Sequence, residues 1–185
     1  MTIVRGRRQE RRDERRSFGA GGDAARYQMR EKLLSIGDDS WIENAAGEHA
    51  FKVNGKALRV RQTLILEDLD GNALCKIQER KLRVKDSMEI EGPGGDRLAM
   101  VKKAMITPLR ARFDVKVEDG PDLRVQGNIV DHEYEIEADG SKIAEISKRW
   151  FRVRDTYGVE IAPGQNEIVV LAVAVAVDAM ADMAD

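Results

Sequence analysis

The amino-acid sequence predicts an all-β domain: an antiparallel β-barrel that encloses one hydrophobic C-terminal helix. Two observations carry this prediction. Short segments in which apolar and polar residues alternate follow one another from Tyr27 to Ile161, and turn residues separate them. Near the C-terminus, the ten residues IVVLAVAVAV at 168–177 are all apolar. The alternating segments supply the strands, and the apolar run supplies the element that they surround.

The alternation is clearest in two segments. In ARFDVKV (111–117) every second residue is apolar and the residues between are charged, and HEYEIEA (132–138) repeats the pattern. TLILEDLDGNALCKIQE (63–79) is expected to form two strands around Asp70-Gly71. We count roughly ten to twelve candidate strands. Because no long amphipathic helix interrupts them, antiparallel hairpins in a closed barrel or a sandwich are expected. The other predicted turns are Asn54-Gly55, GPGGD (92–96), EDGPD (118–122) and Asp139-Gly140.

The apolar run has three interpretations: a membrane span, a buried strand or an enclosed helix. Ten helical residues cover about 15 Å, whereas a bilayer core is about 30 Å thick, which disfavours a span. The apolar pattern continues past the run, which is too long for an ordinary strand, and alanine favours helices. Asn166 can cap a helix, and Glu167 suits its positive end. We therefore expect a helix at about 166–182, frayed at its end by Asp178 and Asp182.

Charge is distributed unevenly along the 185 residues. The net charge is −2, so the whole chain lacks the composition of a basic nucleic-acid binder. Residues 1–25 contain seven arginines and few apolar residues. They are expected to form a disordered Arg-rich arm in front of a barrel domain at 26–185.

Cysteine usage points to a reducing compartment. Cys75 is the only cysteine, so no disulfide can form within the chain. Residues 1–22 lack the apolar stretch of a secretory signal. The expected localisation is cytoplasmic, either free or peripheral to a membrane, and a transmembrane protein is not expected.

An ordered set of segments resembles a known family. The chain is similar to the LURP-one-related proteins, which belong with the Tubby C-terminal and phospholipid-scramblase-like domains. The resemblance implies a twelve-stranded barrel around a hydrophobic C-terminal helix, in a family whose function is largely uncharacterised. Tubby domains bind phosphoinositides through a basic pocket, but their lipid-binding residues match no positions here. The similar segments are YQMREKLLSIGDDSWIENAAGEHAFKVNGKAL (27–58), LEDLDGNALCKIQERKL (66–82), AMVKKAMITP (99–108), VQGNIVDHEYEI (125–136), KIAEISKRWF (142–151) and DTYGVEIAPGQNEIVVLAVAVAVDAMA (155–181).

No catalytic or cofactor motif is present. His49 and His132 are far apart and lack metal-ligand spacing, and one cysteine cannot build a Cys/His zinc site. Cys75 is expected to be a small buried side chain rather than a nucleophile. The sequence GPGGD lacks the Lys-Ser/Thr of a phosphate loop. Trp41 and Trp150 are expected in the core or at the barrel rim. We therefore predict a protein that is not an enzyme, with no cofactor and no metal.

Three groups of basic residues remain as candidates for binding an anionic ligand. Their alternative interpretation is a set of solvated strand faces. The first function predicted is a non-enzymatic binding module for an anionic phospholipid or membrane surface. The alternative is a protein-interaction or structural scaffold. A third hypothesis is weak nucleic-acid binding by the Arg-rich arm, and specific recognition of a nucleic-acid sequence is not expected. The groups are Arg80, Lys81, Arg83 and Lys85; Lys102 and Lys103; and Lys148, Arg149, Arg152 and Arg154.

Overall fold

The computed structural model describes residues 22–30, 39–58, 61–80, 87–107, 110–151 and 155–182. These residues form twelve strands, one short 3-10 helix and one α-helix. The strand count agrees with the upper end of the number predicted from the alternation. The elements are β1 (Ala25–Arg30), β2 (Ser40–Asn44), β3 (His49–Leu58), β4 (Arg61–Glu67), β5 (Ala73–Glu79), β6 (Ser87–Glu91), β7 (Arg97–Thr107), β8 (Arg110–Val117), β9 (Leu123–Asn128), β10 (Glu133–Ala138), β11 (Ser141–Ser147), η1 (Lys148–Trp150), β12 (Thr156–Ile161) and α2 (Glu167–Asp182).

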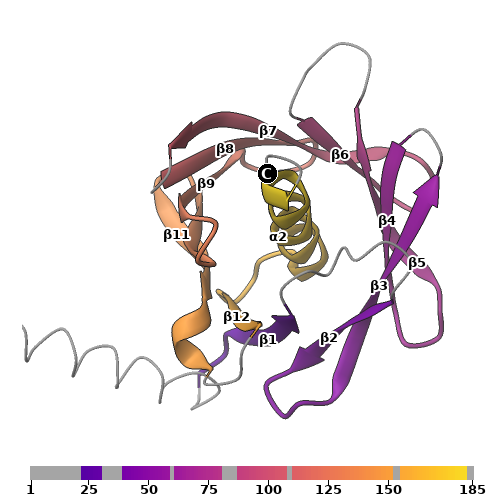
Figure 1. Cartoon of the computed structure of the whole chain (residues 1–185), viewed down its shortest axis with the longest axis horizontal. Coiled ribbons are helices and arrows are strands. Elements are labelled where there is room, and N and C mark those ends of the chain that lie inside the picture. Colours follow the sequence, from indigo (N-terminus) through magenta and orange to yellow (C-terminus); the bar gives the residue numbers. More distant parts are fainter. Residues whose placement is uncertain are drawn as a thin grey trace, which may run out of the picture.

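The strands close into one antiparallel barrel (Figure 1). Each strand pairs with its neighbours in the sequence, and β1 closes the sheet by pairing with β12 as well as with β2. Alternation decides which side chains point inward. In β8, Ala111, Phe113 and Val115 are buried, while the charged residues between them are exposed. A closed sheet leaves no unpaired strand edge, so the barrel presents side chains, not free backbone groups, to a partner.

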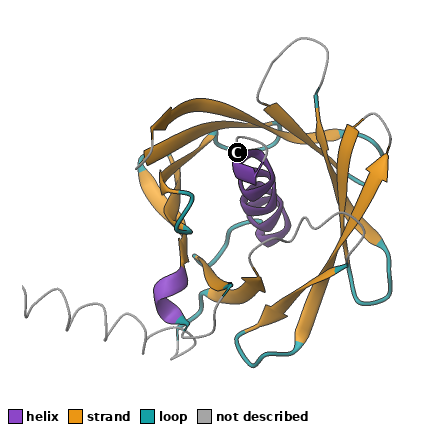
Figure 2. Ribbon diagram, in the orientation of Figure 1, coloured by secondary structure: helices purple, strands orange, loops and turns teal. Residues whose placement is uncertain are grey.

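Helix α2 runs through the middle of the barrel (Figure 2). Every residue from Val169 to Met180 is buried, and the helix shares one hydrophobic core with the inward side chains of the strands. The N-terminus is capped as predicted: the Asn166 side-chain oxygen accepts a hydrogen bond from the Val169 amide at 3.2 Å. Tyr27 of β1 donates a hydrogen bond to Glu167, which ties the first turn to the wall. The prediction of an enclosed C-terminal helix is confirmed.

Two local predictions are wrong. Asn54-Gly55 is not a turn: both residues lie inside β3, where they pair with Ile65 and Leu64 of β4. Continuous pairing with the neighbouring strand outweighs the local turn preference of this dipeptide. Asp178 does not mark a frayed helix end either, because it is buried and the helix continues to Asp182. Its Oδ2 atom accepts a hydrogen bond from Tyr157 of β12, and its Oδ1 atom lies 3.4 Å from His132 in the turn before β10.

Among the described residues, no helix is long and apolar enough to cross a membrane. The predicted Arg-rich arm lies outside the described residues up to position 21.

Candidate functional site

The inside of the barrel contains one cluster of polar side chains, around the C-terminal half of α2. The Tyr157 hydroxyl of β12 donates a hydrogen bond to the Asp178 carboxylate. His132 contributes a ring nitrogen 3.4 Å from the same carboxylate and stacks on the Tyr157 ring with 4.3 Å between centroids. Burial raises the pKa of the Tyr134 hydroxyl well above its ordinary value, and the negative charge of Asp178 adds to that rise. These contacts fix α2 at one depth in the barrel.

This cluster is poorly placed to bind a ligand. Tyr157 is fully buried, Asp178 is 7% exposed, and the apolar side chains of α2 occupy the space beside them. The cluster therefore acts as a structural anchor for the helix. No group of three or more His, Cys, Asp or Glu side chains that could hold a metal ion occurs in the part of the chain that the structure describes. Ligand binding has to be sought on the outer surface.

The outer face of β7 to β10 carries a groove of about 760 Å³, within the usual range of small-ligand sites. We call it the outer groove. Its charged side chains alternate with buried residues of the same strands, as Asp114, Lys116 and Arg124 do, and therefore point away from the helix. The full lining is Arg80, Arg97, Met100, Lys102, Asp114, Val115, Lys116, Asp122, Leu123, Arg124, Glu137, Asp139 and Gly140.

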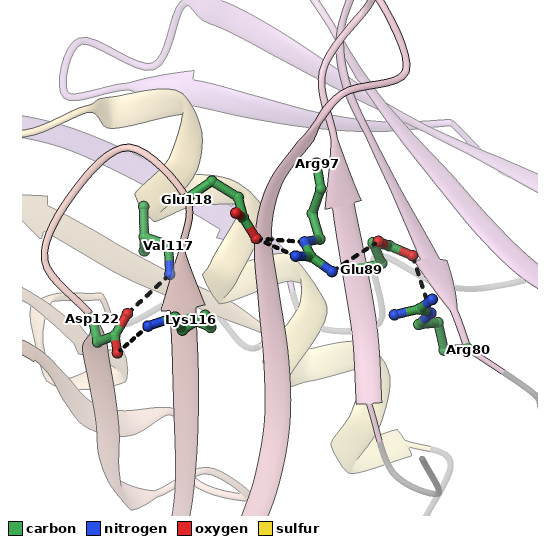
Figure 3. Close-up of polar contacts among 7 residues, drawn as sticks. All are labelled: Arg80, Glu89, Arg97, Lys116, Val117, Glu118 and Asp122. Carbon is green, nitrogen blue, oxygen red and sulfur yellow. Dashed lines mark hydrogen bonds and ion pairs between the residues drawn. The ribbon is translucent and has the colours of Figure 1, made fainter. Parts of the chain in front are cut away.

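One half of the outer groove is neutralised by its own ion pairs (Figure 3). Arg97 lies 2.5 Å from Glu118, and this contact raises the pKa of the Arg97 guanidinium. Glu89 of β6 lies 3.9 Å from Arg97 of β7 and 3.3 Å from Arg80, the residue after β5, so the three charges form a chain. These exposed pairs hold side chains in place and contribute little to stability.

A third basic side chain of the groove is paired in the same way. Lys116 lies 3.2 Å from Asp122, whose second oxygen accepts a hydrogen bond from the Val117 amide (Figure 3). The Asp122 carboxylate therefore joins the end of β8 to the turn that follows it. Arg80, Arg97 and Lys116 all have an acidic partner before any ligand arrives.

The other half of the groove has two basic side chains without such a partner. Lys102 of β7 and Arg124 of β9 are exposed, and neither makes an ion pair or hydrogen bond with the described residues. Both pair in register with Asp114 of β8, one from each side. Asp114 itself is 3.7 Å from Arg112. Two strand spacings, or roughly 10 Å, separate the backbones that carry the two cations, which a long side chain can span.

Of the three basic groups predicted from the sequence, two contribute to the outer groove. Arg80 and Lys102 line it. Lys103 follows Lys102 but pairs with Phe113, which is buried inside the barrel, so the two lysines occupy register positions on opposite faces. The predicted residues Lys81, Arg83, Lys85, Arg152 and Arg154 lie outside the described residues.

The remaining predicted residues, Lys148 and Arg149, lie in η1, apart from the outer groove. Arg149 is 3.0 Å from Glu133 of β10. Burial lowers the pKa of the Lys148 ammonium, although Asp155 and Asp178 oppose the change. Partial burial also raises the pKa of Glu133, against the influence of Arg149 and Ser147. This group therefore supports the local structure that follows β11.

Sequence reasoning missed Arg124, Lys116 and Arg97 as site residues. None of them belongs to a run of basic residues, because each stands alone between apolar or acidic neighbours in its own strand. Their common feature is that all three line the outer groove. Strand alternation predicts that Lys116 and Arg124 point outward. It does not predict this for Arg97, which is two residues before the buried Ala99 and lies next to a register shift between β6 and β7.

Comparison with known proteins identifies the family. The LURP-one-related family profile matches residues 25–178, which includes every described strand and most of α2. A solved structure of a protein from Arabidopsis thaliana has a TM-score of 0.64 and 17% sequence identity to the chain, covering 88% of this chain and 92% of that one. No curated protein matches. The structural likeness supports the fold, and the profile match extends over most of the sequence: the chain belongs to the LURP-one-related family.

Proposed function

We propose that this protein is a non-enzymatic binding module whose outer groove binds the phosphate of an anionic phospholipid at a membrane surface. One observation carries the proposal: Lys102 and Arg124 line the groove and have no acidic partner among the described residues, whereas Arg80, Arg97 and Lys116 do. Cations that are not internally neutralised are the ones that can pair with a ligand without first breaking a contact.

A phosphate suits this arrangement chemically. Lysine and arginine supply ammonium and guanidinium donors, and an arginine can bind two phosphate oxygens at once. Each such side chain near an anionic membrane contributes about 1 kcal/mol. Met100, only 7% exposed although its neighbours Ala99 and Val101 point inward, gives the groove a partly apolar floor. The filled barrel interior supports binding on the outside, without a chemical step.

The test is vesicle co-sedimentation with neutral vesicles and with vesicles containing an acidic phospholipid. The full chain is compared with the double variant Lys102→Ala/Arg124→Ala. We expect salt-sensitive binding to acidic vesicles, reduced about 30-fold by the double substitution, which corresponds to about 1 kcal/mol for each cation. Both residues are exposed, so the variant is expected to fold normally.

A matched control removes two cations elsewhere on the barrel. Lys52→Ala/Lys76→Ala lowers the net charge equally, but these lysines lie on β3 and β5, do not line the groove and are paired with Asp39 and Glu91. This variant is expected to keep most of the affinity. Equal losses in both variants would reduce the effect to general charge, and no binding by the full chain would refute lipid binding. A chain that lacks residues 1–21 separates the groove's contribution from that of the predicted Arg-rich arm.

A further inference from the structure

We infer that the outer groove recognises a headgroup carrying both a phosphate and an ammonium group, with phosphatidylserine as the acidic lipid of that class. This inference rests on the proposed function and narrows its ligand. It comes from two acidic residues in the same groove, Glu137 of β10 and Asp139 of the turn that follows. Neither makes an ion pair with the described residues; Glu137 only accepts a hydrogen bond from the Gln126 amide at 2.8 Å. The groove therefore offers available negative as well as positive charge.

The strand register places these charges in order. Lys102 pairs with Asp114, Asp114 with Arg124, and Arg124 with Glu137, so the row reads positive, negative, positive, negative from β7 to β10. Strands in a sheet are about 4.8 Å apart, so the row extends over roughly 15 Å. Asp139 lies two residues after Glu137, in the turn that follows β10, and it also lines the groove. Charges of both signs therefore occupy neighbouring positions along the row, within reach of one bound molecule.

A row of opposite charges could simply stabilise the sheet through cross-strand pairs. The contacts argue against this interpretation for the row from Lys102 to Glu137. Arg124 and Glu137 are register partners, yet they form no ion pair, whereas Arg97, Lys116 and Arg80 each reach an acidic residue. The charges that could neutralise one another in the row remain apart, and both signs remain available to a ligand.

This mixture discriminates between classes of anionic headgroup. A headgroup with phosphates alone would gain from Lys102 and Arg124 but would meet repulsion from Glu137 and Asp139. A headgroup that adds an ammonium group satisfies both sets at once. The groove is therefore expected to prefer phosphatidylserine over phosphatidylglycerol at equal surface charge, a preference that a purely basic patch would not produce.

The experiment compares vesicles containing phosphatidylserine with vesicles containing phosphatidylglycerol, at equal mole fraction and ionic strength, using the full chain. We expect the phosphatidylserine vesicles to bind about threefold to tenfold more tightly, from two exposed ion pairs. The variant Glu137→Gln/Asp139→Asn is expected to remove this preference by gaining affinity for phosphatidylglycerol. Glutamine preserves the size of Glu137, and asparagine tolerates the positive φ of 50° at position 139.

The outcomes separate this inference from the proposed function. Equal binding of both vesicles by the full chain, or a preference unchanged in the double variant, overturns the inference and leaves lipid binding intact. Binding to neither vesicle overturns the proposed function itself. Calorimetry with soluble glycerophosphoserine tests the source of the headgroup: affinity for the soluble compound with none for vesicles would overturn a membrane-bound ligand.

Discussion

The inside of the barrel and the outer groove use charged residues in opposite ways. Inside, Asp178 is the charged residue on the enclosed stretch of α2, and Tyr157 and His132 both contact its carboxylate. In the groove, Lys102 and Arg124 remain unpaired among the described residues although acidic residues lie on the adjoining strands. A buried charge without partners would destabilise the fold, whereas an exposed one costs little. The interior is therefore organised for stability, and the groove can be organised for a ligand.

The largest expected effect is on stability, from a cavity beside the helix. Leu171→Ala removes a fully buried side chain of α2 and should lower the free energy of unfolding by about 2–5 kcal/mol. The apolar wall encloses the helix, so the lost volume cannot readily be filled. Urea denaturation followed by circular dichroism measures this loss.

Leu69→Ala is the matched control, because it makes the same substitution at a residue that is 60% exposed in the turn between β4 and β5. It is expected to change the free energy of unfolding by no more than about 0.5 kcal/mol. Similar losses in the two variants would mean that α2 is not enclosed as the structure describes.

A smaller effect is expected from the polar anchor of the helix. Asp178→Ala leaves the buried Tyr157 hydroxyl and His132 without the carboxylate, at a cost of about 1–3 kcal/mol. Asp178→Asn should cost less, because its amide oxygen can still accept the Tyr157 hydrogen bond. Tyr157→Phe should be less destabilising in the Asp178→Ala background than in the natural chain. Strict additivity in that double-mutant cycle would show that the two side chains do not stabilise each other.

The two regions also differ in how far the sequence predicts them. The interior follows from local rules: alternation in 111–117 assigns the buried face of β8, and Asn166 before a long apolar run marks the start of α2. The turn predicted at Asn54-Gly55 is wrong because strand pairing outweighs local preference: the pairing of β3 with β4 extends through a dipeptide that favours turns.

The groove could not be predicted in the same way. Its residues come from different strands, and runs of basic residues supplied only Arg80 and Lys102 of its lining, while they also led to Lys148 and Arg149, which lie in η1. The neighbours Lys102 and Lys103 show the reason: adjacent residues in a strand point to opposite faces, so a cluster in the sequence is divided by the sheet. A surface site on a barrel is formed by residues from several strands, and the pairing register of those strands decides which residues lie side by side.

The smallest expected effect concerns Cys75, whose thiol should hardly react with iodoacetamide in the folded protein. Its side chain is 1% exposed inside the barrel, and burial raises the pKa of the thiol to about 12. At pH 8 very little of the thiol is then ionised in the folded protein, and only the thiolate reacts readily. Iodoacetamide should therefore leave the folded chain unmodified and label it rapidly in urea, as mass spectrometry can follow.

The raised pKa of Cys75 also makes the free energy of unfolding depend on pH. Above pH 9.0 the thiol ionises in the unfolded chain but not in the folded one, so the contribution of this group to stability falls as the pH rises toward 12. Cys75→Ala should remove that part of the alkaline dependence. Rapid labelling of the folded chain would contradict a closed barrel, and slow labelling that accelerates in Leu171→Ala would measure how often the interior opens.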